Sequence, residues 1–217
     1  EGAEGGLTGR TSAEGSHAVT DQAAEPPPMV TLPLAIHADP ALDDALLEAW
    51  IETANGFYAP AGVEFRMVER HALPSDSRTL RNNRARHNLA RRLRNRAINV
   101  FFVDEIHDPW PSAETARASA RVGRIPSGRL GGAHIPKPNR TPGSYVIVLG
   151  TRERSAFAPV GLAHELGHVL GSPHHPDPTN IMSYGRDRTG FDEAQLRRFR
   201  IRARRLIRRR QVRRVAP

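Results

Sequence analysis

The chain has 217 residues, a net charge of +9 and 38% hydrophobic residues, which allows one sizeable core with appendages. No apolar run approaches the roughly twenty residues that cross a bilayer, so no transmembrane segment is expected. The absence of cysteine excludes disulfides and thiolate metal ligands.

The positive charge is concentrated in two arginine-rich segments. The C-terminal one, from Arg197 to Arg214, holds eleven arginines and no acid, which exceeds the net charge of the whole chain. The other, residues 78–96, holds eight arginines and no acid. Dense arginine binds phosphates and anionic surfaces, so a nucleic acid or an anionic surface is a candidate partner, above all for the C-terminal run. A solvated helix face is the alternative for both segments.

Residues 1–28 are predicted to be a disordered leader or linker. They are rich in Gly, Ala, Glu, Ser and Pro, end in three prolines, and contain too few apolar residues to fold alone. The first twenty residues show no basic-then-apolar pattern, so we expect no signal peptide in this chain, and prior removal of one is the alternative that stays open. We expect a secreted or periplasmic bacterial protein, with which the lack of cysteine agrees.

Beyond residue 28 the pattern indicates regular structure. Residues 29–36 are predicted to form a strand, at a sheet edge because Pro33 has no amide hydrogen to donate. A helix follows, capped by Asp39 with Pro40 in its first turn, and it is expected to stop at Asn55-Gly56. Its apolar residues recur with the helical period: Leu42, Ala45, Leu46, Ala49 and Trp50.

The middle of the chain alternates between basic, loop-like and apolar segments. Residues 80–96 are predicted to be helical in spite of their charge. Residues 104–130 show no periodicity, and a loop of that length in a compact domain is often functional. Strands are predicted at 63–68, where apolar residues alternate, at 98–103, an apolar run suited to a buried strand, and at 144–149. A helix is predicted at 159–170, with its proline early, as helix starts allow.

This helix carries the most informative motif of the chain. His164 and His168 stand four residues apart on one helix face, so both can bind one metal ion while Glu165 lies beside it. Gly171 allows a left-handed turn that brings His174 back as a third ligand. Three protein ligands leave a position for water, which is typical of a catalytic zinc site. The alternative is a helix that carries histidines by chance.

Together these residues match the consensus His-Glu-x-x-His-x-x-Gly-x-x-His, and the segment resembles the metzincin clan of zinc endopeptidases. The clan has a methionine-containing turn beneath the metal, and residues 179–185 look like that turn, with Met182 as its methionine. Tyr184 is similar to a tyrosine of the astacin and serralysin branches that contacts zinc or the oxyanion. Ordinary core packing is the alternative for Met182, and packing or surface exposure for Tyr184.

The resemblance implies a zinc ion held by His164, His168 and His174, and hydrolysis of peptide bonds by zinc-activated water. Glu165 is then the general base, and Tyr184 donates to the oxyanion. The implied fold is α+β, with a twisted mixed sheet, an active-site helix, a methionine turn and a C-terminal helix. Zinc is the cofactor that we expect, and no acid-rich calcium loop stands in the sequence.

By the same resemblance, the glycine-rich segment 131–136 is expected to be the antiparallel edge strand that pairs with an extended polypeptide substrate. Its residues Gly132, Ala133 and His134 would offer main-chain hydrogen bonds, which give affinity without sequence selectivity. His134 either points into the cleft or, in the more ordinary case, is an exposed surface histidine.

The last predicted helix begins at Asp192, which forms a capping box with Gln195. Phe191 and Leu196 are expected to form a hydrophobic staple. The catalytic domain is expected to span 29–200, with 201–217 as an arginine-rich continuation of the helix and a tail. One apolar stripe should face the core, with the arginines outward: Leu196, Phe199, Ala203, Leu206 and Ile207.

Two other functions fit the sequence. One is a non-catalytic zinc-binding module that binds polyanions through its arginines, although binding alone does not need Glu165. The other is a zinc hydrolase of non-peptide substrates, against which only the edge strand and the methionine turn argue. Residues 1–28 are also a candidate inhibitory segment, through an acid such as Asp21 or Glu25.

Overall fold

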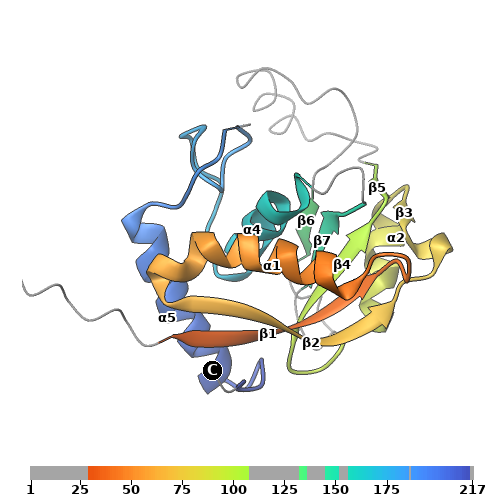
Figure 1. Cartoon of the computed structure of the whole chain (residues 1–217), viewed down its shortest axis with the longest axis horizontal. Coiled ribbons are helices and arrows are strands. Elements are labelled where there is room, and N and C mark those ends of the chain that lie inside the picture. The colour runs from red at the N-terminus through yellow and green to blue at the C-terminus, as the bar shows by residue number, and fades with distance from the viewer. Residues whose placement is uncertain (1–28, 108–131, 136–144, 152–155, 186, 216–217) are drawn as a thin grey trace, which may run out of the picture.

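The structure, a computed structural model, describes residues 29–107, 132–135, 145–151, 156–185 and 187–215. The predicted leader at 1–28 and most of the predicted loop at 104–130 therefore lie outside the described residues. Within the described part, the chain forms a mixed α/β fold around a five-stranded sheet, drawn in Figure 1. No helix in that part has both the length and the apolar character needed to cross a membrane.

The main sheet has the strand order β2-β1-β4-β7-β6. Four of its strands run parallel, and the short β6 pairs antiparallel with β7 at one edge. The bounds are β1 Val30–Ala38, β2 Val63–Ala72, β4 Ile98–Val103, β6 Gly132–Ile135 and β7 Tyr145–Leu149. Two short strands, β3 Thr79–Leu80 and β5 Glu105–Ile106, form a separate parallel pair.

Both faces of the sheet are covered, so its central strands are mostly apolar. Along β4, Val100 and Phe102 belong to one hydrophobic core, while Phe101 and Val103 belong to a second core on the opposite face. The helices α1 Asp44–Tyr58, α4 Ala158–Val169 and α5 Glu193–Arg208 pack in the first core. The short α2 Asn83–Asn88 and the 3₁₀ turn Leu89–Arg92 border the second.

The prediction that the first strand is an edge strand is wrong. β1 pairs with β2 on one side and with β4 on the other, so it is internal. Pro33 is tolerated because pairing with β4 begins only at Leu34, one residue later. The missing donor therefore lies where β1 has a neighbour on one side only.

The predicted limits of the first helix are also wrong. Asp43 caps α1, and its side chain accepts from the amide of Leu46, whereas Asp39 accepts from Ala41 in the preceding turn. The helix continues through Asn55 and Gly56, because the Asn55 side chain makes two hydrogen bonds with the backbone of Phe65 instead of ending the helix. The chain turns only at Gly62, which has a φ of 64°.

The arginine-rich segment 80–96 is helical only in part. An α-helix covers Asn83–Asn88 and a 3₁₀ turn covers Leu89–Arg92, whereas the prediction was one longer helix. The side chain of Asn82 accepts from the amide of Ala85, so the cap delays the start of the helix.

The last helix follows the prediction closely. Asp192 and Gln195 form the capping box, and Phe199, Ala203 and Leu206 are buried in the first core. Phe191 and Leu196 are both half-buried against that core, although their mutual contact remains a prediction. After the helix, the chain folds back, because Val212 is buried and the amide of Arg213 donates to the carbonyl of Arg96.

Candidate metal centre

Three histidines converge at the C-terminal half of α4. His164 and His168 lie one helical turn apart on one face. Gly171 then takes a φ of 86°, and the chain returns with His174. One ring nitrogen from each histidine lies within 4.8 Å of the other two. The Nε2 atoms of His168 and His174 are 3.2 Å apart. The structure thus brings together the three residues that the spacing predicts as metal ligands.

Backbone carbonyls orient two of these rings. Nδ1 of His164 donates to the carbonyl of Ile181 at 2.7 Å, and Nδ1 of His168 donates to that of Ser172 at 2.8 Å. Each ring is then protonated at Nδ1, which leaves the Nε2 lone pair facing the cluster. A second-shell acceptor on the far nitrogen is typical of metal-ligating histidines.

Burial keeps the three imidazoles neutral. It lowers the pKa of His164 to about 3 and that of His174 to about 4, and it lowers the pKa of His168 as well. Neutral imidazole is the form that binds a metal. Three neutral nitrogen donors whose lone pairs face one another fit zinc, and zinc chemistry needs no thiolate here.

Glu165 lies beside this cluster and is buried. Within the described part of the chain, its Oε2 atom has no hydrogen-bond partner. Burial raises the pKa of Glu165 to about 8, an effect that the guanidinium of Arg188 opposes. An adjacent cation favours the ionised form of a carboxyl group, so a bound metal would restore the carboxylate. A buried carboxyl group without a partner is costly unless a ligand completes its surroundings.

The edge strand β6 approaches Glu165 from the side. A Cβ on Gly132 would stand 2.6 Å from Oε1 of Glu165 and 2.9 Å from the carbonyl oxygen of Ile147. Only glycine leaves this room. His134 of the same strand stacks on His168 with ring centroids 6.0 Å apart. It is half-buried, so the interpretation of His134 as an exposed surface histidine is wrong. Ala133, between them, pairs with Ile147.

The turn at residues 180–183 packs beneath α4. Met182 is fully buried, and a Cβ on Gly167 would collide with its sulfur atom. Gly167 therefore lets the methionine press directly on the helix that carries His164 and His168. Met182 fills core space, as its alternative interpretation proposed, but the space is directly under the histidines.

Tyr184 contacts one of the three histidines. Its hydroxyl lies 3.0 Å from Nδ1 of His174, with ring centroids 4.5 Å apart. The side chain is 37% exposed, so it stands at the open side of the cluster. The neighbouring His175 turns away, since its Nε2 pairs with Asp192 at 3.4 Å and its amide donates to Met182.

Sequence reasoning missed several supporting residues. Arg188 is half-buried, and its guanidinium donates to the carbonyl of Ile181 at 3.4 Å and lies 3.3 Å from Nδ1 of His164. Ser172 and Ile181 act through their carbonyls, which side-chain type cannot reveal. Gln195 donates to Ser172 and accepts from Asn180, so the cap of α5 also supports the histidine cluster. In the sequence, the small residue Gly167 inside the motif is the one sign that another side chain packs closely against this helix.

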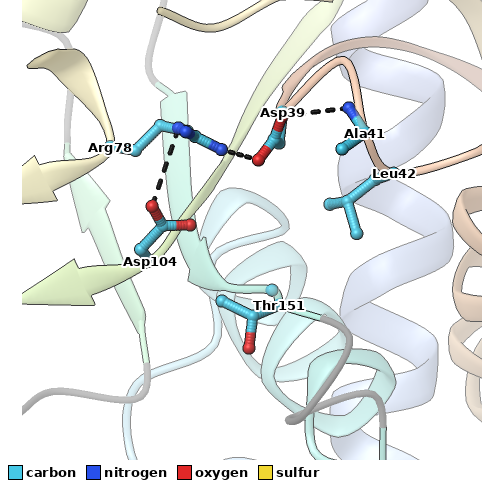
Figure 2. A pocket seen from close by; sticks show the side chains of 7 residues that line it. Asp39, Ala41, Leu42, Arg78, Asp104 and Thr151 are labelled. Carbon is cyan, nitrogen blue, oxygen red and sulfur yellow. Dashed lines mark hydrogen bonds and ion pairs between the residues drawn. The ribbon is translucent and has the colours of Figure 1, made fainter. Parts of the chain in front are cut away.

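A second group of polar residues lies at the carboxyl ends of β1 and β4, shown in Figure 2. Arg78 forms ion pairs with both Asp39 and Asp104 across this hollow. The single guanidinium offsets one of the two carboxylate charges. The two ion pairs of Arg78 connect the ends of β1 and β4. The histidine cluster is therefore the stronger candidate for chemistry.

Comparison with solved structures finds similar folds. The crystal structure of Archaemetzincin (amzA) from Methanopyrus kandleri matches with a TM-score of 0.49 and 18% identity, over 80% of this chain and 96% of that chain. A zinc-dependent peptidase from Methanocorpusculum labreanum matches with a TM-score of 0.44 and 11% identity, over 78% and 99%. A scan of protein-family models and a search of curated proteins find no match. Both TM-scores lie below 0.5, so these likenesses assign no function to the chain.

Proposed function

We propose that this protein is a zinc-dependent endopeptidase of metzincin type that hydrolyses extended polypeptides. One observation carries the proposal: three neutral histidines converge beside the buried carboxyl group of Glu165, whose Oε2 atom has no hydrogen-bond partner among the described residues. A structural zinc site would need a fourth protein ligand and would have no use for that carboxyl group. A catalytic site needs both the open position and the base.

His164, His168 and His174 would hold the ion. When bound, zinc lowers the pKa of its water toward neutrality and acts as a Lewis acid on the scissile carbonyl. Glu165 accepts the proton of the attacking water and later delivers it to the leaving amine. Its buried position keeps bulk water away, so the carboxylate is a stronger base than it would be in solvent.

Tyr184 and β6 serve the substrate in this proposal. The hydroxyl of Tyr184 is at the open side of the cluster, where it can donate to the oxyanion as the tetrahedral centre forms. Among the described strands β6 pairs with β7 alone, so its other edge can pair with an extended peptide. Gly132, Ala133 and His134 would supply those main-chain contacts.

The arrangement of elements supports the metzincin type. A mostly parallel sheet with an antiparallel edge strand lies above the helix that carries the motif, and a buried methionine lies beneath it. We therefore propose that residues 180–184 form the methionine turn, and that α5 is the C-terminal helix of the catalytic domain.

The test is cleavage of unfolded casein by the purified chain, with zinc, after chelation, and after zinc is added back. We expect cleavage that chelation abolishes and zinc restores. A protein that binds one zinc ion yet cleaves no unfolded polypeptide, even without residues 1–28, would contradict peptidase activity. Cleavage that chelation does not affect would contradict the role of the metal.

A further inference from the structure

We propose that the outward face of α5 binds the phosphate backbone of double-stranded nucleic acid. This arginine face consists of six exposed side chains: Arg197, Arg198, Arg204, Arg205, Arg208 and Arg209. The proposal is independent of the peptidase activity, because it rests on a different element and on different residues.

The core fixes the direction of this face. Phe199, Ala203 and Leu206 are buried on the opposite side of α5, and the capping box at Asp192 holds the start of the helix. The arginines therefore project from a rigid scaffold. Ordering them against a ligand costs side-chain entropy only, because the backbone is already fixed.

Two other arginines of the same segment are already engaged. Arg200 donates to the carbonyl of Ala61 at 2.9 Å, and Arg213 pairs with Glu69 at 3.4 Å. By contrast, within the described part of the chain the side chains of the six arginines of the arginine face make no ion pair or hydrogen bond. No acid follows Glu193 up to Arg214 that could compensate them. Such a face carries strong positive potential that an anionic partner can neutralise.

The dimensions of the arginine face suit a duplex backbone. Arg197, Arg204 and Arg208 lie on successive or alternate turns of one stripe that is about 16 Å long at the rise of an α-helix. A duplex carries roughly ten phosphate charges over that length of its axis. Arginine presents a planar fork that matches two phosphate oxygens, which lysine cannot do.

Other polyanionic partners fit less well. Single-stranded nucleic acid is usually held by stacking on aromatic side chains, and the arginine face has none. A membrane-binding helix inserts an apolar face, but the apolar face of α5 is buried in the core. Ile201, 59% exposed, is the large apolar side chain that α5 presents to solvent. Backbone binding to a duplex, without reading of bases, uses what this face offers.

The arginine face also leaves the histidine cluster accessible. Among the described residues, α5 supports the cluster through Gln195 in its first turn, which donates to Ser172. Arg200 already lies against the 3₁₀ turn Ala59–Ala61, at the amino-terminal side of β2. In Figure 1, α5 runs along the outer side of the molecule, away from β6. A duplex bound at α5 would therefore leave β6 open. Other proteins bound to the same nucleic acid would then lie close to this edge strand.

The test uses the full-length chain and a mixed-sequence 30-bp DNA duplex, with affinity measured by fluorescence anisotropy at several salt concentrations. In the first variant, Arg197, Arg204 and Arg208 are replaced by Gln, a good helix former. We expect affinity to fall by about tenfold or more near 0.1 M salt. The slope of log affinity against log salt should become shallower by about 3, because three phosphate contacts are lost.

The matched control replaces three exposed arginines elsewhere, Arg81, Arg84 and Arg91, by Gln. This control variant loses the same net charge as the first variant. It should keep most of the parent's affinity for the duplex and most of its salt dependence. An equal loss in both variants would overturn the proposal, because binding would then follow net charge alone. Equal binding of phosphatidylserine vesicles by the parent, lost in the first variant, would also overturn it in favour of a membrane surface.

A measurement on the parent protein covers the case in which the first variant does not fold. Arginines are modified with phenylglyoxal, with and without the duplex, and mapped by mass spectrometry. Protection of Arg197, Arg204 and Arg208 with no protection of Arg81 and Arg84 supports the proposal. Uniform protection, or none, contradicts it.

Discussion

Gly132 of the edge strand and Glu165 of the motif helix are in direct contact. The carboxylate lies where the side chain of any other residue at position 132 would stand, since a Cβ there would be 2.6 Å from Oε1. The strand proposed to bind substrate therefore also sets the position of the proposed base. These two residues are 33 positions apart in the chain, and only the fold joins them.

Gly132→Ala should lower the rate of peptide cleavage by about a hundredfold, because a misplacement of the base by about 1 Å costs that much. Zinc content should stay unchanged, since the atoms nearest to a Cβ at position 132 belong to Glu165 and Ile147 and not to the three histidines. The comparison is kcat and zinc content of the variant and parent. Gly56→Ala is the control, because nothing lies within 4 Å of a Cβ there. Parent-like kcat in Gly132→Ala would contradict the positioning role.

Glu165→Gln keeps the shape of the side chain and removes the base. Peptide cleavage should fall by a factor of about a hundred to ten thousand, while zinc content and thermal stability stay close to those of the parent. Activity assays, metal analysis and thermal unfolding measure these three quantities. Loss of stability and of zinc together with activity would indicate a structural role for Glu165.

His174→Ala should weaken zinc binding by about a hundredfold or more, because a ligand is lost and not merely its support. His175→Ala should weaken it far less, because the ring of His175 faces Asp192. Competition with a chromophoric chelator gives both affinities. Equal weakening by the two substitutions would contradict the assignment of His174.

His37 should make the protein less stable in mild acid. Burial lowers its pKa from 6.5 to about 4, so below pH 6.5 the unfolded chain takes up a proton that the folded chain refuses. The contribution of neutral His37 to the free energy of unfolding is therefore fully present above pH 6.5, and it is lost as the pH falls toward 4. At pH 5, about 1.5 pH units below the unfolded pKa, the free energy of unfolding lost through His37 is about 2 kcal/mol.

His37→Phe isolates this effect. The ring still stacks on Phe101, and Oδ1 of Asn99 keeps the hydrogen bond from the amide of Arg94. Urea unfolding of both proteins at pH 7.5 and pH 5 should show a smaller acid-induced loss in the variant. Identical losses would mean that other groups, such as the three histidines of the metal centre, account for the acid sensitivity.

Local patterns determined much of what the sequence predicts. The spacing of His164, His168 and His174 follows from the helical period and one left-handed glycine, which are properties of a short segment. The capping box of α5 and its apolar stripe are equally local. Even the fully buried strand β4 can be identified from its continuous apolar run.

The tertiary structure decided what depends on neighbours from elsewhere in the chain. Asn55 and Gly56 did not end α1, because the backbone of Phe65 satisfied the asparagine side chain. Pro33 could stand in an internal strand, because its second neighbour begins one residue later. Arg188 and the glycine space at 132 became part of the site only through packing. The periodicity of the sequence determines which residues share one face of a helix or strand. Burial and hydrogen bonds with distant segments determine which residues pack against that face.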